Sequence, residues 1–147
     1  MKGICFICMA NYCRSPVAEA LLRKYLKNDL VNITSAGLNP ILKADMDSRS
    51  RKYLEKNNTK AFIHIPKAIT HEHFMTNDFV IALDYGIFLE LNKQFPDFRN
   101  KVYLLNENVP ETNLSDPYLF NDDKYDLVME DIDKCVKIFA ESIKNKI

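Results

Sequence analysis

The chain has 147 residues, of which 47% are hydrophobic and 27% charged, and 20 basic side chains balance 20 acidic ones. This length is typical of one domain with a buried core, so we expect a single domain over residues 1–147. The balanced charge excludes the strongly basic surface typical of nucleic-acid binding, and no run approaches the roughly 18 apolar residues of a membrane span. We therefore expect neither a nucleic-acid partner nor a membrane-bound protein.

Short apolar runs alternate with helical patterns along the chain. Buried strands are predicted at residues 3–7, 32–36, 79–83 and 102–105. The first helix is predicted from Pro16 to about residue 26, and the second from after a cap at Asp47 to about residue 57. Two more are predicted from residue 87 to 95 and from near Asp123 to close to the end of the chain. Strands that alternate with helices predict an α/β fold, with right-handed crossovers and a parallel sheet covered by helices on both faces.

The segment 8–16 joins the first predicted strand to the first predicted helix and concentrates reactive side chains. A loop that curls into a cup there would point its N–H groups inward, and the start of the helix would add further donors for an anion. Such a pocket favours the thiolate form of Cys8, while Arg14 offers a planar fork of donors to two phosphate oxygens. We expect Ser15 to cap the helix and to donate its hydroxyl to the Cys8 sulfur. The segment therefore has the outline of a phosphoryl-transfer site.

This segment resembles the N-terminal signature of the low-molecular-weight protein tyrosine phosphatases, in which Cys-x5-Arg-Ser-Pro follows a strand. The likeness extends to the Ala18-Glu19-Ala20 that follow and to Asp116-Pro117-Tyr118, which matches a second family motif. It implies a doubly wound, four-stranded parallel sheet and a hydrolase that dephosphorylates phosphotyrosyl proteins through a phosphocysteine, without a cofactor. The phosphate-binding loop implied by the resemblance comprises Met9, Ala10, Asn11, Tyr12, Cys13 and Ser15, between and beside Cys8 and Arg14.

The resemblance makes Cys8 the nucleophile, Arg14 the phosphate clamp and Asp116 the general acid and then the general base. The chemistry agrees, because a thiolate that cleaves a phosphate ester needs a proton for the leaving oxygen. Asp116 lies in a long loop, residues 106–121, that could bring a carboxylic acid over the cup. Taken alone, Asp116 before a proline would be an ordinary turn residue.

Three polar residues match a supporting network in the family: Asn11, Ser35 and His64. Asn11 suits a left-handed loop position, and Ser35 and His64 could hold it in place. Outside this context His64 would be a half-buried structural imidazole. Asp84 ends the third predicted strand on the same side, where it could either support the site or cap the next helix.

The chain departs from the family pattern around the substrate cleft. Ala10 stands where glycine is frequent, so we infer that this position does not need a positive φ. Residues 39–41 lack the aromatic side chain that many members have, and Leu119 replaces a common second tyrosine. Tyr12 and Tyr118 remain as aromatic walls, which predicts a phosphatase with reduced selectivity for phosphotyrosine.

The four cysteines indicate a reducing, cytoplasmic setting rather than a disulfide framework, because three crowd one strand and loop while Cys135 is remote. The apolar start of the chain continues into an amphipathic helix and does not indicate a signal peptide. The family resemblance implies a reversible disulfide between Cys8 and Cys13. Cys5 and Cys8 lack the second pair of ligands that a zinc site needs, so no metal is expected, and Cys5 and Cys135 are expected in the core.

Two other functions compete with the phosphatase hypothesis. An arsenate reductase shares the Cys-x5-Arg loop, but it needs further resolving cysteines, and none lies between Cys13 and Cys135. A non-catalytic phosphopeptide-binding module would need neither Cys8 nor Asp116. The sequence predicts neither the physiological substrate nor the oligomeric state.

Overall fold

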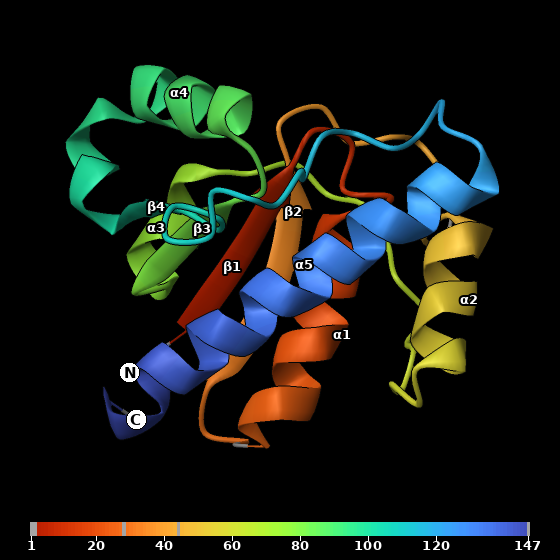
Figure 1. Cartoon of the computed structure of the whole chain (residues 1–147). Helices are drawn as coiled ribbons and strands as arrows, with labels where there is room; N and C mark the ends of the chain where they lie inside the picture. Colours follow the sequence, from red (N-terminus) through yellow and green to blue (C-terminus); the bar gives the residue numbers. More distant parts are fainter. Residues whose placement is uncertain (1–2, 28, 44, 147) are drawn as a thin grey trace.

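The computed structural model describes residues 3–27, 29–43 and 45–146. Its sheet has four parallel strands in the order β2-β1-β3-β4 (Figure 1). The strands are β1 (Gly3–Cys8), β2 (Asn32–Gly37), β3 (Phe79–Ala82) and β4 (Val102–Leu104). The predicted four-stranded parallel sheet is therefore confirmed, and each predicted strand agrees with the observed one to within a residue at its ends.

Helices cover both faces of this sheet (Figure 1). One face carries α1 (Ser15–Leu26), α2 (Ser48–Lys56) and α5 (Asp122–Ile143), followed by the short 3-10 helix η2 (Lys144–Lys146). The other face carries α3 (His71–Thr76), α4 (Tyr85–Gln94) and the 3-10 helix η1 (Pro96–Lys101). The central strand β1 is buried along its whole length, with Ile4 and Phe6 in the α1/α5 core and Cys5 and Ile7 in the α3/α4 core. This arrangement is the doubly wound α/β fold.

Three local predictions need correction. Ser15 does not cap α1: it is the first residue of the helix, the N-cap is Arg14, and no side chain satisfies that cap. The helix predicted from residue 87 begins at Tyr85, because the Asp84 carboxylate caps it by accepting from the N–H of Ile87. Helix α3 is absent from the sequence prediction, since it has six residues and buries only Phe74, too little for a helical period to appear.

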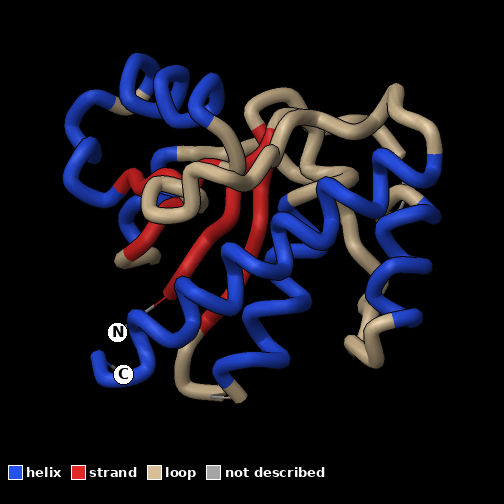
Figure 2. The backbone as a smooth tube through the Cα atoms, viewed as in Figure 1, coloured by secondary structure: helices blue, strands red, loops and turns tan. Residues whose placement is uncertain are grey.

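The carboxyl ends of β1, β2 and β4 lead into the connecting segments 9–14, 38–47 and 105–121. Figure 2 shows loops gathered at the edge of the sheet where β1 and β2 end. Parallel α/β sheets bind ligands at this edge, so the fold brings the segment after Cys8 to the expected place. In the described part of the chain, no helix combines the length and the apolar run that crossing a membrane would take.

Candidate active site

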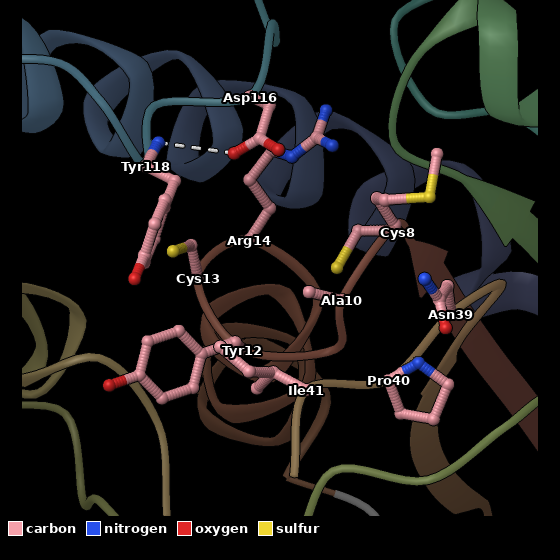
Figure 3. Close-up of a pocket in the computed structure, with 11 residues that line it drawn as sticks. Cys8, Ala10, Tyr12, Cys13, Arg14, Asn39, Pro40, Ile41, Asp116 and Tyr118 are labelled. Atoms are coloured by element: carbon pink, nitrogen blue, oxygen red, sulfur yellow. Dashed lines mark hydrogen bonds between the residues drawn. The ribbon is translucent and has the colours of Figure 1, made fainter. Parts of the chain in front are cut away.

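A cavity of about 290 Å³ opens above the loop that joins β1 to α1 (Figure 3). Its floor is this loop, and its rim comes from the segment after β2 and from the long loop before α5. The structure therefore gathers residues more than 100 positions apart in the sequence. The lining residues are Cys8, Met9, Ala10, Tyr12, Cys13, Arg14, Asn39, Pro40, Ile41, Asp116 and Tyr118.

Cys8 is the last residue of β1, and only 3% of it is exposed. Its Sγ lies 2.9 Å from the Ser15 Oγ, which also accepts a hydrogen bond of 2.8 Å from the Asn11 side-chain amide. The Asn11 bond uses one lone pair of the Ser15 oxygen, so the hydroxyl proton can point at the sulfur and stabilise a thiolate. The predicted contact between Ser15 and Cys8 is confirmed.

Asn11 fixes the shape of the loop. It is fully buried and has φ 52°, the left-handed conformation predicted for it. Its side-chain Nδ2 donates to Ser35 Oγ at 3.0 Å, and its backbone carbonyl oxygen accepts from His64 Nε2 at 2.7 Å. The network continues beyond the predicted residues, because Ser35 donates to Glu19 at 2.7 Å and the Lys67 backbone N–H donates to Asn11 Oδ1 at 3.0 Å. Both predicted partners of Asn11 are therefore in contact with it.

Arg14 is 2% exposed and belongs both to the loop and to the start of α1. Its Nη1 donates to Asp84 Oδ2 at 2.6 Å and to the carbonyl oxygen of Leu114 at 2.7 Å. Burial acts to lower the pKa of Arg14, but the neighbouring Cys8 and Asp84 raise it above its ordinary value. The guanidinium is thus a fixed positive charge at the cavity. Asp84 fulfils both roles left open by the sequence, since its other oxygen caps α4.

Asp116 reaches the cavity from the loop before α5, on the same side as the Arg14 guanidinium (Figure 3). Its Oδ1 accepts a hydrogen bond of 3.1 Å from the N–H of Tyr118, the contact expected of an aspartate in a turn. An isolated turn residue would have no reason to share a cavity with a buried cysteine and a buried arginine. The structure thus brings together Cys8, Arg14 and Asp116.

The walls of the cavity are partly aromatic. Tyr12 and Tyr118 lie on one side with ring centroids 6.2 Å apart and an interplanar angle of 62°, and Asn39 and Pro40 lie opposite (Figure 3). Ala10 is not among the described non-glycine residues with positive φ, so alanine is accommodated there without strain, as predicted. The slot between the walls suits a flat, apolar group.

The remaining cysteines lie away from the cavity. Cys5 is buried beneath α3 and α4, where burial raises the pKa of its thiol to about 12, and Cys135 is buried in α5. All four cysteines are free thiols. Within residues 3–27, 29–43 and 45–146, no group of three or more His, Cys, Asp or Glu side chains is arranged to hold a metal ion.

Besides Glu19 and Lys67 in the Asn11 network, sequence reasoning missed Gly37 and Arg49. Gly37 packs against the loop at Met9 and Asn11, and the signal for it was a glycine that ends an otherwise regular strand. Arg49 binds the segment around Tyr118, and nothing local in the sequence connects the two. Both contacts depend on how distant segments pack.

Comparison with known proteins identifies the architecture. The model of the family described as low molecular weight phosphotyrosine protein phosphatase matches residues 3–147. The chain belongs to this family. A low molecular weight phosphotyrosine protein phosphatase of Rattus norvegicus is 31% identical over 150 residues, which cover 95% of this chain and 94% of the relative.

Two solved structures of phosphatases have the same fold as this chain. The tyrosine phosphatase Wzb from Escherichia coli K30, in complex with sulphate, is 27% identical with a TM-score of 0.89, covering 97% of this chain and 98% of that one. The YwlE arginine phosphatase, as a mutant with a phosphorylated active site serine, is 26% identical with a TM-score of 0.86, covering 97% and 95%. The solved structures that share this fold therefore include phosphatases named for two different phosphorylated residues.

Proposed function

We propose that this chain is a cysteine-dependent protein tyrosine phosphatase, which hydrolyses phosphotyrosine and related aryl phosphate monoesters in protein substrates. The observation that carries the proposal is that Cys8, Arg14 and Asp116 line one cavity. A nucleophile, a charge clamp and a proton donor are the three groups that a thiolate-based phosphatase requires. Neither a metal nor a cofactor takes part in the proposed reaction.

In the first step, the Cys8 thiolate attacks phosphorus and the bond between phosphorus and the aryl oxygen breaks. Asp116 gives its proton to the departing oxygen, so the product leaves as a neutral phenol. The backbone N–H groups of residues 9–14 and the Arg14 fork hold the three remaining phosphate oxygens. The product on the protein is a phosphocysteine.

In the second step, water attacks the phosphocysteine and Asp116, now a carboxylate, takes a proton from that water. The bond between sulfur and phosphorus breaks, inorganic phosphate leaves, and the Ser15 hydroxyl stabilises the returning thiolate at 2.9 Å. The phosphorylated active site serine in the YwlE mutant supports a covalent intermediate on an active-site side chain in a relative.

The walls of the cavity favour an aryl phosphate over a phosphorylated guanidinium. Tyr12 and Tyr118 offer aromatic faces to a phenyl ring. A guanidinium would instead be recognised by carboxylates. Among the described residues that line the cavity, Asp116 is the only one with a carboxylate. Because the YwlE arginine phosphatase has the same fold, phosphoarginine is the second candidate substrate.

We further propose that the chain acts as one phosphatase domain in the cytoplasm. The family match over residues 3–147 supports the single domain. Four free thiols, two of them at the cavity, support a reducing compartment.

The experiment measures turnover of p-nitrophenyl phosphate, of a phosphotyrosine peptide and of a phosphoarginine peptide by the wild type and by Cys8→Ser. We expect the wild type to turn over both aryl esters, with the phosphotyrosine peptide preferred to the phosphoarginine peptide. Cys8→Ser should abolish turnover yet still bind inorganic phosphate, because the cup and Arg14 remain. No turnover by the wild type would refute the proposal, and more than a few per cent of wild-type rate in Cys8→Ser would exclude Cys8 as nucleophile.

A further inference from the structure

Two arginines hold the loop that carries Asp116, one on each side of it. Arg14 donates to the carbonyl oxygen of Leu114 at 2.7 Å, two residues before Asp116. Arg49 donates to the carbonyl oxygen of Tyr118 at 2.9 Å, two residues after it. Arg14 already belongs to the proposed phosphate site, whereas Arg49 lies in α2 and outside the residues that line the cavity. The bond from Arg49 to Tyr118 therefore holds the loop without using a residue of the proposed phosphate site.

Arg49 uses its guanidinium to bridge two segments. Its Nε and Nη2 donate to the two carboxylate oxygens of Asp47 at 3.1 and 3.0 Å. Its Nη1 donates to the carbonyl oxygen of Phe120 at 2.9 Å, beside the bond to Tyr118. The plane of the guanidinium also packs on the ring of Tyr125, with its central carbon 4.1 Å from the centroid. These contacts fix the orientation of the fork as well as its position.

Asp47 connects this arrangement to the phosphate loop. Its backbone N–H donates to the carbonyl oxygen of Tyr12 at 3.0 Å, and its carboxylate accepts a long contact of 3.8 Å from the Cys13 thiol. Burial acts to raise the pKa of Asp47, but hydrogen bonds from Arg49 lower it below its ordinary value. The pair is thus charged at neutral pH and links the floor of the cavity to the loop above it.

The last connection passes through a single residue. The Tyr118 carbonyl oxygen accepts a hydrogen bond of 2.9 Å from Arg49, and the Tyr118 N–H donates one of 3.1 Å to the Asp116 carboxylate. The bond from Arg49 and the bond to Asp116 thus lie on the two peptide groups that flank Tyr118, so a shift of Arg49 would act on the residue that orients Asp116. Two other turn contacts nearby, from the Phe120 N–H to the Pro117 carbonyl oxygen and from the Ser115 N–H to Asn113 Oδ1, lie within the loop. The ring of Tyr118 also contacts that of Tyr12, but this contact does not involve the peptide groups on either side of Tyr118.

We propose that Arg49 is a positioning residue for the general acid: it holds Tyr118, and through it Asp116, at the height above the phosphate loop where proton transfer to the leaving oxygen occurs. This inference rests on the proposed phosphatase function. Arg49 does not contact Cys8 and is not itself among the residues that line the cavity, and the lining residue that it holds directly, Tyr118, is the one that orients Asp116. Its main effect should therefore fall on the part of the reaction that needs Asp116.

The test is a series of single-turnover measurements of phosphocysteine formation with aryl phosphates of increasing leaving-group pKa. Arg49→Met should slow the reaction of phosphotyrosine by about 10- to 100-fold, the cost of misplacing a catalytic group. For an ester with a strongly acidic phenol the loss should stay within about threefold, because such an oxygen leaves without protonation. Binding of inorganic phosphate should be unchanged within the same factor.

A double-mutant cycle with Asp116→Asn decides whether Arg49 acts through Asp116. Once the acid is gone, Arg49→Met should have no further effect on phosphocysteine formation, so the two changes should not be additive. Arg49→Lys covers the case in which the methionine variant does not fold, because its single ammonium can pair with Asp47 but cannot also hold both carbonyls. This variant should show the same leaving-group dependence to a smaller degree.

Arg51 provides the matched control. It lies two residues further along α2, pairs with Asp45 at 2.6 Å, and is 28% exposed compared with 24% for Arg49. Arg51→Met should leave the leaving-group dependence unchanged. An Arg49 effect that is equal for all esters, or that adds in full to Asp116→Asn, would overturn the inference. A wild type without any turnover would instead refute the proposed function itself.

Discussion

Gly37 at the end of β2 and Asn11 in the phosphate loop are packed so closely that no side chain fits between them. A Cβ on Gly37 would lie 2.9 Å from the Asn11 backbone nitrogen and 2.7 Å from the carbonyl oxygen of Met9. Both atoms belong to the backbone, which cannot rotate away as a flexible side chain would. The neighbouring strand therefore sets the height of the loop.

Gly37→Ala should accordingly impair both folding and catalysis. Overpacking of this kind costs about 1–3 kcal/mol of stability, measurable by urea unfolding. Turnover of p-nitrophenyl phosphate should fall as well, because the cup around the phosphate is displaced. Gly86→Ala is the control: its Cβ would meet only Asp84 Oδ1, at 3.4 Å, and the variant should be at least as stable as the wild type. Normal activity in Gly37→Ala would show that the loop does not depend on this contact.

Arg14→Lys should be nearly as damaging as Arg14→Ala. Arg14 has one nitrogen occupied by Asp84 and Leu114, which leaves the rest of the fork for phosphate. A lysine ammonium is a single point charge and cannot serve the carboxylate and the phosphate together. Loss of such a donor typically reduces kcat on the order of 10²–10³-fold, which steady-state kinetics would detect. Recovery of most of kcat by lysine would contradict the clamp assignment.

Peroxide should inactivate the enzyme reversibly through Cys8 and Cys13, which line the same cavity as free thiols. Burial raises the pKa of the Cys13 thiol to about 12, so peroxide should oxidise Cys8 first, to a sulfenic acid. Cys13 can then condense with it, releasing water and forming a disulfide that thiols reduce.

Cys13→Ser provides the comparison, since that variant lacks the resolving thiol. Its inactivation should become irreversible under continued peroxide, because Cys8 would proceed to sulfinic acid. Mass spectrometry of the oxidised wild type should find the Cys8–Cys13 bridge. Sulfinic acid on Cys8 without any bridge would count against this role of Cys13.

His64 should make the stability of the fold depend on pH. It is 4% exposed and donates through Nε2 to the Asn11 carbonyl oxygen, and burial lowers its pKa below the ordinary 6.5. Lys67 and Arg23 act in the same direction, whereas Asp45 and the bond to Asn11 oppose it. Below pH 6.5 the unfolded chain therefore binds a proton at His64 more readily than the folded one.

Stability should consequently fall as the pH drops from 6.5 toward the lower pKa of folded His64. His73 has a lowered pKa as well, so the informative quantity is the difference between the wild type and His64→Gln. Urea unfolding at a series of pH values should give a shallower pH dependence in the variant. Identical slopes would mean that His64 titrates alike in both states.

The sequence by itself determined the elements whose signals are local. Alternating apolar runs and helical patterns predict the strands and most helices, and the nine residues from Cys8 to Pro16 contain the proposed nucleophile, clamp and cup together. The motif at Asp116 was recognisable because it is contiguous. Local chemistry predicts two roles for Ser15, to cap α1 and to donate to Cys8. The tertiary structure keeps only the contact with Cys8, because Ser15 is the first residue of the helix and its hydroxyl contacts Asn11 and Cys8.

Only the tertiary structure decided which distant residues complete the site. Arg14 meets Leu114, 100 residues away, and Arg49 meets Tyr118, 69 residues away. Such pairs depend on the strand order β2-β1-β3-β4 and on the crossovers that bring the carboxyl ends of the strands to one edge. The periodicity of a single segment does not encode this strand order. The order depends on burying the apolar faces of all the helices against the sheet together. Gly37 beneath Asn11 has the same origin, in the pairing of β2 with β1.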